Sequence, residues 1–335
     1  MGRLKEAHAN NDKISAVRIG KAYLAGTAKT VWVPDAKTQE RRDWFHVHRK
    51  AVKRTTQLRN RLLSYLSDQG VRLAKGTPLA KGPTAEGQLR PLKEWSPRQW
   101  QVIEGLLMEL RHADEQRDHW RSLIAQEVLA DPQLLSIVRL CGVREMVAFA
   151  LGALIGDIKR FAEPRKRVKY IGLNPAFDHS GQGQWSGGIA GHGRKDLRGL
   201  LIESAQAILR SHHPLALWSK DAGGTQTSGG RYSTGLAKWG KKLLARKGSV
   251  NLAAGAVARK LAVAIWYLLM GRWTPLEEID ERLARKVGKI ITSVGPKGLK
   301  QLGKTRQVLR KETFNSLTTG RVYMLDPNKT FAPAG

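Results

Sequence analysis

Apolar residues follow a helical period over most of the chain. The pattern predicts a short helix over residues 12–25 that ends at Gly26, and Thr30-Val31-Trp32-Val33 before Pro34 is typical of a strand. Residues 36–131 predict two long helices joined by a loop rich in Gly, Pro and Lys. The second helix begins at Ser96-Pro97 and ends at Asp131-Pro132. Apolar positions three and four apart give each helix a coiled-coil-like seam: Trp44, Val47, Ala51, Leu58, Leu62 and Tyr65 in the first, and Ile103, Leu106, Leu110, Ala113, Trp120 and Ile124 in the second.

The second half of the chain predicts a compact, mostly helical domain over residues 132–275. It begins with two short helices that are broken at Cys141-Gly142, followed by Gly-rich, irregular segments over residues 170–193 and 221–235. Further helices are expected over residues 196–209, 236–247 and 252–270, the last of them apolar on most faces and therefore central. After Pro275 the sequence predicts a basic, turn-rich tail. The chain is thus expected to be mainly α, divided into residues 1–35, 36–131, 132–275 and 276–335.

The pair of long helices has two interpretations. One is a plain helical hairpin. The other is an extended arm that serves dimerisation or nucleic-acid contact, and the basic residues between the apolar positions of the first helix, such as Arg49, Lys53 and Arg59, favour it.

Charge changes this picture more than composition does. The 335 residues hold 58 Lys and Arg against 28 Asp and Glu, a net charge of +30. A fold does not need that excess, whereas a polyanionic partner would explain it. Because the charge is spread along the chain and the apolar run at residues 261–270 is short for a membrane span, nucleic acid is the expected partner and no membrane is expected. The single cysteine excludes a disulfide scaffold and a Cys-based zinc site, and it fits a reducing compartment.

The segment from Gly172 to Arg198 is the main candidate for chemistry. Its glycines bring backbone amides close to a ligand such as phosphate, and cations follow at the start of a helix, where the dipole favours anions. Ser180 lies inside the segment, and its hydroxyl could attack a phosphodiester. The alternative is that the segment is only a flexible connector. Ser186 and Ser228 are further candidates for the nucleophile. The candidate nucleic-acid contacts here are Gly181, Gly187, Gly193, Arg194, Lys195 and Arg198.

Two further positions are candidates on their own residues. The turn at Cys141-Gly142 could present amides to a nucleic-acid backbone, or it could be an ordinary helix corner. Asp12 suits a helix N-cap. A nuclease that uses Mg²⁺ needs several acidic residues together, and the sequence has no visible cluster of them.

Residues 172–198 resemble the C-terminal domain of the insertion sequence 110 family of transposases, a group also named for insertion sequences 116, 902 and 1111. The family pattern is met without gaps by Gly172, Leu173, Pro175, Ser180, Gly181, Gly187, Ile189, Gly193, Leu197 and Arg198. Three further landmarks occur in the family order: Asn11 to Ala16 with Val31 to Pro34, Ile155 to Ile158 with Arg160-Phe161, and Ala256 to Ala262. The resemblance covers roughly residues 8 to 275.

The resemblance implies a bacterial, cytoplasmic and nucleoid-associated enzyme that cleaves and rejoins DNA through a serine hydroxyl, here Ser180. It implies a RuvC-like domain with four acidic residues that bind Mg²⁺, of which Asp12 matches one. It also implies nucleic-acid contact at Gly142 and Arg160, a structured guide RNA that selects the DNA, and a homo-oligomer, dimer or tetramer, in which serine and carboxylates meet between protomers.

The sequence departs from the family at three places. Ser15 stands where the second Asp of the family's D-x-x-D motif belongs, and the earlier acidic residues would precede Met1. The helix–hairpin–helix turn, usually Pro-Gly-Val-Gly, is Cys141-Gly142-Val143-Arg144 here. We therefore expect an N-terminally truncated member with only the end of the RuvC-like domain in residues 1–35. The alternative function is a catalytically impaired remnant that binds DNA or RNA. A basic structural RNA-binding protein would explain the charge but not residues 172–198.

Overall fold

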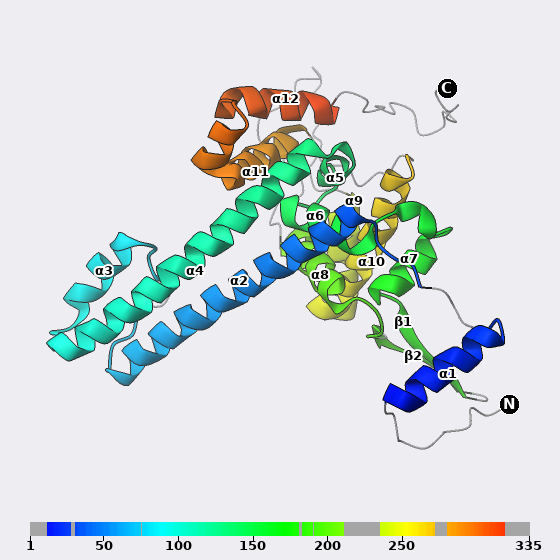
Figure 1. The fold of residues 1–335 in the computed structure, drawn as a ribbon, viewed down its shortest axis with the longest axis horizontal. Helices are drawn as coiled ribbons and strands as arrows, with labels where there is room; N and C mark the ends of the chain where they lie inside the picture. Colours follow the sequence, from blue (N-terminus) through cyan, green and yellow to red (C-terminus); the bar gives the residue numbers. More distant parts are fainter. Residues whose placement is uncertain are drawn as a thin grey trace. The chain divides into compact units, whose positions relative to one another are not determined.

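The structure is a computed structural model that describes residues 12–27, 31–74, 76–180, 183–189, 191–210, 235–271 and 280–318. The chain divides into two compact units, Met1–Lys37 and Thr38–Gly335, each of which is described by itself. The mainly α fold is confirmed, with one pair of strands in the described residues. Figure 1 shows the elements in chain order: α1 (Asp12–Leu24), α2 (Ala36–Asp68), α3 (Pro83–Leu89), η1 (Arg90–Leu92), α4 (Pro97–Ala130), α5 (Pro132–Val138), α6 (Glu145–Ile155), η2 (Ile158–Arg160), α7 (Pro164–Ile171), β1 (Pro175–Ser180), β2 (Gly183–Ile189), α8 (Lys195–Arg210), α9 (Gly235–Lys247), α10 (Val250–Leu269), α11 (Asp280–Gln301) and α12 (Arg306–Thr318).

The first unit contains the predicted short helix but lacks the predicted strand in its described part. Helix α1 ends before Gly26, which has a φ of 64° that suits glycine. Val31 and Val33 are exposed and lie in irregular backbone, so the strand prediction for these residues is wrong. A strand needs a neighbour to accept its backbone hydrogen bonds, and the apolar pattern of residues 30–33 alone supplies none.

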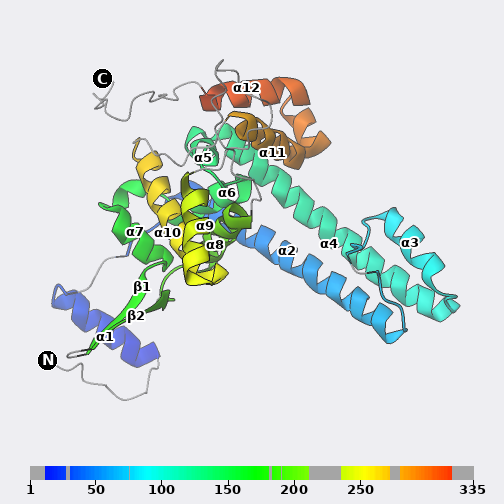
Figure 2. The ribbon, with the colours of Figure 1, turned by 180° about the vertical axis from the view of Figure 1, so that it is seen from behind.

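The two long helices form an arm, and Figures 1 and 2 both show α2 and α4 side by side with α3 packed near the tip. The predicted start of α4 is confirmed, because the Ser96 hydroxyl accepts from the Gln99 amide at 3.3 Å and the Gln99 side chain accepts from the Ser96 amide at 3.0 Å. The loop prediction for the connection is only partly right, since α3 and η1 lie within it. Helix α3 buries Ala85 and Leu89 in a small arm core with Leu62 and Ile103.

The seam of α2 differs from the predicted one in the first half of the helix. Val47 is 39% exposed, and the buried positions are instead Arg41, Phe45, His48 and Thr55. For Arg41 the partners come from α4 and the residue that ends it, because its guanidinium bonds the carboxylates of both Glu127 and Asp131. From Leu58 onward the predicted apolar seam is confirmed, and so is that of α4 except at Trp120, which is only half-buried.

His48 makes the stability of the arm dependent on pH. Burial lowers its pKa to about 4, and the cations of Arg121 and Arg117 contribute to the same shift. In the unfolded chain His48 has a pKa near 6.5, so between pH 6.5 and 4 the unfolded state binds a proton at this residue and the folded state does not. We expect the free energy of unfolding to fall by roughly 3 kcal/mol across that window because of this one residue.

The measurement is urea unfolding at pH 7, 6, 5 and 4 for the wild type and for His48→Leu. The leucine variant should lose less stability on acidification than the wild type. His46→Gln is the matched control, because His46 lies on the same helix and is exposed. Equal acid sensitivity of the wild type and His48→Leu would contradict the assignment.

The main core surrounds α10, which contacts α7, α8, α9 and α5. Ala254, Ala258, Leu261 and Ile265 are fully buried on it, which confirms the predicted central helix. The sequence estimate of a short apolar run is corrected here, because α10 is long and apolar enough to cross a membrane by length and composition. Its burial against four other helices explains that composition as a core helix.

The predicted tail beyond Pro275 is corrected in the described part, because residues 280–318 form helices α11 and α12. Leu283, Val287 and Ile291 of α11 meet Leu309 of α12 and Leu135 of α5 in a core of their own. Gly295 and Pro296 mark a kink within α11, where Gly295 has a φ of 72°. Periodic apolar residues that contact α4 and α5 outweigh these local breakers.

Candidate functional site

The glycine-rich segment forms a β-hairpin rather than the irregular loop that its composition predicts. Strands β1 and β2 pair antiparallel, with Pro175 opposite Ile189 at one end and Ser180 opposite Gly183 at the other. Main-chain hydrogen bonds hold such a pair without help from side chains, so glycine in β2 is compatible with it. The side chains of residues 176–187, and Gly181 altogether, lie outside the described residues. The candidates Ser180 and Gly187 are therefore located by their backbone alone.

Two glycines hold the base of the hairpin. Gly172 ends α7 in a left-handed conformation, with φ 80° and ψ 32°, and its Cα would be 3.0 Å from a Cβ at Gly193, itself at φ 117°. The amide of Arg194 donates to the Tyr170 carbonyl at 3.1 Å beside this contact. The chain that enters the hairpin thus touches the chain that leaves it, which only residues without a Cβ permit. Close packing at positions 172 and 193 thus explains why two residues of the family block are glycines.

The cations that follow the hairpin bond groups of this chain. Arg194 forms a two-point pair with Asp196, with the shorter contact at 2.9 Å, and this bond raises the pKa of Arg194. Burial alone would raise the pKa of Asp196, but the Arg194 pair and the Leu197 amide together lower it. Arg198 donates to the Gly191 carbonyl at 3.0 Å, and Lys195 at the start of α8 is exposed. Arg194 and Arg198 therefore fasten the hairpin base to α8.

Three arginines from separate parts of the chain come together near that base. Arg160 lies over the rings of Phe161 and Tyr170, 4.4 and 4.6 Å from their centroids. Arg42 of α2 donates to the Ala153 carbonyl at 2.9 Å. Burial is the main reason that the pKa of Arg42 is lowered, and the charges of Arg194 and Arg160 add to it. We call Arg42, Arg160 and Arg194 the arginine group.

Sequence reasoning found two members of this group and missed Arg42. The arm helix carries so many basic residues that none of them stands out by spacing, and only the fold brings this one next to α7 and α8. Arg259 was also missed as a site residue. It lies in α10, within the family landmark at residues 256–262. Its Nε donates to the Leu173 carbonyl at 3.0 Å, so it holds the chain that enters the hairpin.

The other predicted positions are spread over the molecule. Arg49 is exposed on α2, with its charge acting on Asp196, and Lys53 is exposed farther along the same helix. Arg59 lies between the arm helices, 3.9 Å from Asp114. Gly142 turns the chain between α5 and α6 with a φ of 74°, and a Cβ there would be 2.7 Å from Ile208 of α8. That close approach supports the helix-corner interpretation of this turn.

Ser180 is separated from the arginine group along the hairpin. Five residue steps of extended chain lie between Pro175 at the base and Ser180 at the end of β1. At about 3.3 Å per step, this is roughly 17 Å. The structure therefore brings Arg160, Arg194, Gly172 and Gly193 together and leaves Ser180 at the other end of the strands.

Asp12 is exposed at the start of α1, in the first unit. Within the described stretches no three His, Cys, Asp or Glu residues gather as a metal site would require. Asp12 by itself offers one carboxylate, so most ligands of an Mg²⁺ ion bound there would have to come from other groups, such as water or substrate phosphate.

Comparison with known proteins now gives the geometry a context. The family model described as the transposase IS116/IS110/IS902 family matches residues 136–218. The transposase for insertion sequence element IS1111A of Coxiella burnetii is 27% identical over 266 residues, which cover 77% of this chain and 66% of the relative. A probable family 20 transposase of Pseudomonas aeruginosa is 25% identical over 262 residues, 77% of this chain and 72% of that protein. A putative transposase, y4qE, of Sinorhizobium fredii is 23% identical over 269 residues, 75% of this chain and 62% of that protein.

The chain thus spans about two thirds of the length of the curated relatives that it matches. The matched family region runs from the end of α5 through the hairpin to α8, so it contains Ser180, both base glycines and two members of the arginine group. The family resemblance expected from the block at residues 172–198 is therefore confirmed: residues 136–218 match the IS116/IS110/IS902 family of insertion-sequence transposases, and the three relatives are transposases.

Proposed function

We propose that this chain cleaves and rejoins DNA strands at an insertion sequence, with the hydroxyl of Ser180 as the nucleophile. One observation carries the proposal: the family block is unbroken over residues 172–198, and the backbone of Ser180 lies at the end of a hairpin whose base adjoins the arginine group. A residue at the end of a hairpin can approach a DNA backbone that a residue inside a helical core cannot reach.

The proposed chemistry is the exchange of one phosphodiester for another. Ser180 Oγ attacks phosphorus and loses its proton, the new Oγ–P bond forms, and the bond from phosphorus to a deoxyribose oxygen breaks. The released sugar oxygen takes up a proton. Rejoining reverses these steps with a hydroxyl from another strand, so no oxidant or reductant is needed.

The arginine group holds DNA phosphates several base-pair steps along the duplex from the cleaved one. The roughly 17 Å between the hairpin base and Ser180 corresponds to about five base-pair steps of 3.4 Å. Guanidinium groups bind phosphate oxygens at two points, so Arg42 and Arg160 would fix the register of the DNA without reading its sequence. Arg194 contributes less charge, because Asp196 already pairs with it.

The groups that neutralise charge at the cleaved phosphate come, in this proposal, from another protomer. The separation of Ser180 from the arginine group of its own chain supports the homo-oligomer that the family resemblance implies. A structured guide RNA as the selector of the DNA sequence is proposed on the resemblance alone. Mg²⁺ is proposed on the same ground, with Asp12 as one ligand, and no step above is drawn through the ion.

The test is a recombination assay with plasmids that carry the element's ends, together with capture of a covalent protein–DNA adduct. Ser180→Ala should lower recombination by roughly a thousand-fold or more and abolish the adduct, because the bond to DNA is made by the missing oxygen. Ser186→Ala is the matched control, a serine on the facing strand, and should keep both activities.

Recombination by Ser180→Ala at the wild-type rate would remove this serine from the mechanism. Failure of the wild-type chain to form any adduct, with DNA binding intact, would favour the second candidate function, a DNA- or RNA-binding protein without catalysis. Ser15 is the observation behind that candidate, because it stands where the family motif has a carboxylate.

A further inference from the structure

Helices α11 and α12 form a packed element outside the matched family region. Besides their shared core with α5, Lys286 of α11 donates to the Val138 and Leu140 carbonyls at 2.9 and 2.6 Å, where α5 ends. Ser122 of α4 donates to the Val294 carbonyl. Apolar burial and direct hydrogen bonds thus fix the position of α11 on α4 and α5. The backbone that carries its outer side chains is therefore fixed as well.

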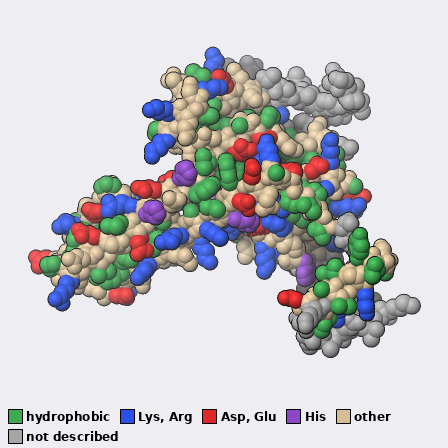
Figure 3. All heavy atoms as spheres, viewed as in Figure 1, with side chains coloured by type: hydrophobic (Ala, Val, Ile, Leu, Met, Phe, Trp, Pro, Cys, Tyr) green, Lys and Arg blue, Asp and Glu red, His purple; other side chains and the backbone are tan. Residues whose placement is uncertain are grey.

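The charge of this element is strongly positive. Residues 280–318 include ten Lys and Arg against three Asp and Glu, a net charge of +7. Figure 3 shows Lys and Arg side chains along the outer edge of α11 and α12. Lys289, Arg306 and Arg310 are exposed, and no carboxylate of the described chain forms an ion pair with any of them. Repulsion among these cations opposes folding, and an anionic partner would relieve it.

The three cations share one side of α11. Lys289 lies next to Gly288, and the guanidinium of Arg310 would be 4.0 Å from a Cβ at Gly288. Arg306 lies 3.4 Å from the Thr292 hydroxyl, one turn farther along α11. Positions 288, 289 and 292 fall on the face of α11 opposite to its buried residues. Two helices therefore contribute positive charge to one surface.

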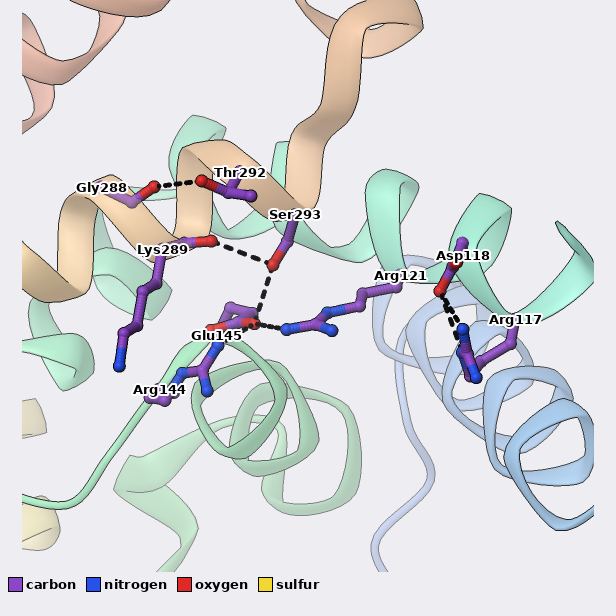
Figure 4. A network of polar contacts seen from close by, with 9 residues as sticks. All are labelled: Arg117, Asp118, Arg121, Arg144, Glu145, Gly288, Lys289, Thr292 and Ser293. Atoms are coloured by element: carbon purple, nitrogen blue, oxygen red, sulfur yellow. Dashed lines mark hydrogen bonds and ion pairs between the residues drawn. The ribbon is translucent and has the colours of Figure 1, made fainter. Parts of the chain in front are cut away.

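A buried carboxylate, that of Glu145, holds two further arginines beside this surface. Glu145 is 1% exposed, and its Oε1 accepts from Arg121 at 3.0 Å, from Arg144 at 3.1 Å and from the Ser293 hydroxyl at 3.2 Å. Figure 4 shows this network, with Lys289 one turn before Ser293 on α11. The side chains of Arg121 and Arg144 remain 38% and 44% exposed. One buried negative charge thus holds two half-exposed guanidiniums beside α11.

We infer that Arg121, Arg144, Lys289, Arg306 and Arg310 form a second DNA-binding surface, the basic face, which holds the sugar–phosphate backbone of duplex DNA away from the hairpin. The surface carries five cations from four elements and one carboxylate, and that carboxylate is buried. An array of cations held at fixed positions suits the regular spacing of duplex phosphates, and contacts to phosphates position DNA without reading its sequence. The choice of DNA as the occupant rests on the proposed function.

The experiment measures binding of the full chain to a 25-base-pair duplex of arbitrary sequence over a range of salt concentrations. The test variant combines Lys289→Gln, Arg306→Gln and Arg310→Gln. The control variant combines Lys297→Gln, Lys300→Gln and Lys311→Gln, which removes the same charge from exposed positions elsewhere on the same helices. The test variant should bind roughly 100-fold more weakly at 0.1 M salt and lower the salt slope by about 2 to 3, whereas the control should change the slope by less than about 1.

Equal losses in the two variants would overturn the basic face, because the effect would then be one of net charge. A greater loss for an RNA hairpin than for the DNA duplex would also overturn it in favour of RNA. Ser180→Ala, measured alongside, separates the two proposals. If Ser180→Ala recombines DNA normally while the salt slope of DNA binding falls by about 2 to 3 in the test variant, the basic face is supported and the serine mechanism is contradicted.

Discussion

Gly172→Ala should lower the free energy of unfolding by roughly 2 to 5 kcal/mol and eliminate the proposed DNA cleavage. A left-handed backbone costs an alanine roughly 1 to 2 kcal/mol. The added methyl group would also overlap the His192 carbonyl and the Arg198 guanidinium, and forcing such a contact apart costs roughly 1 to 3 kcal/mol more. Because the carbonyl belongs to the backbone, the hairpin base has to open, and this moves Ser180 relative to the arginine group.

Gly191→Ala provides a control for the backbone term. Gly191 has nearly the same conformation, with a φ of 76°, but a Cβ there meets no atom within 4 Å. The difference between the two variants in urea unfolding therefore measures the close approach at Gly172. If both lose the same stability, contact between the two ends of the hairpin contributes nothing beyond backbone strain.

Arg167→Met should raise the free energy of unfolding, by roughly 1 to 4 kcal/mol. Arg167 on α7 is 0% exposed, and among the described residues none accepts a hydrogen bond from any of its three guanidinium nitrogens. A buried cation without a partner opposes folding, and a methionine of similar length fills the space without charge. Arg165→Met, at an exposed position of the same helix, should change stability by less than about 0.5 kcal/mol.

The pH dependence gives a second measurement for Arg167. Burial lowers its pKa to about 9, against 12.5 for an ordinary arginine. Above pH 9 the folded state releases a proton that the unfolded chain keeps, so the cost of the buried charge declines and stability rises with pH. The difference in the free energy of unfolding between Arg167→Met and the wild type should therefore become smaller from pH 8 to pH 10. A methionine variant that is several kcal/mol less stable than the wild type would instead indicate an anionic partner for this arginine.

Local signals in the sequence were sufficient for much of the fold. The capping residues at Ser96, the break at Cys141-Gly142 and the apolar pattern of residues 252–270 located α4, the α5–α6 corner and α10. The block at residues 172–198 identified the family. These features depend on neighbours within a few positions along the chain, and such neighbours are visible in the sequence itself.

The site required the tertiary structure. Nothing in the sequence separates Arg42 from the other cations of α2, yet the fold brings Arg42 within the electrostatic reach of Arg160 and Arg194. The Gly-rich composition suggested a loop where the chain pairs as a hairpin, and the basic, turn-rich sequence after Pro275 suggested a tail where α11 packs on α4.

The sequence by itself therefore determined α4, α8, α9 and α10 and the resemblance to this family of transposases. Only the tertiary structure decided which polar residues are buried, which cations share a surface and how far Ser180 lies from the arginine group. The physical reason is that helix formation and capping depend on contacts within a turn or two of the chain. The burial of Arg41 against Glu127 and Asp131, or of Glu145 between Arg121 and Arg144, depends on partners that the fold brings together from distant positions.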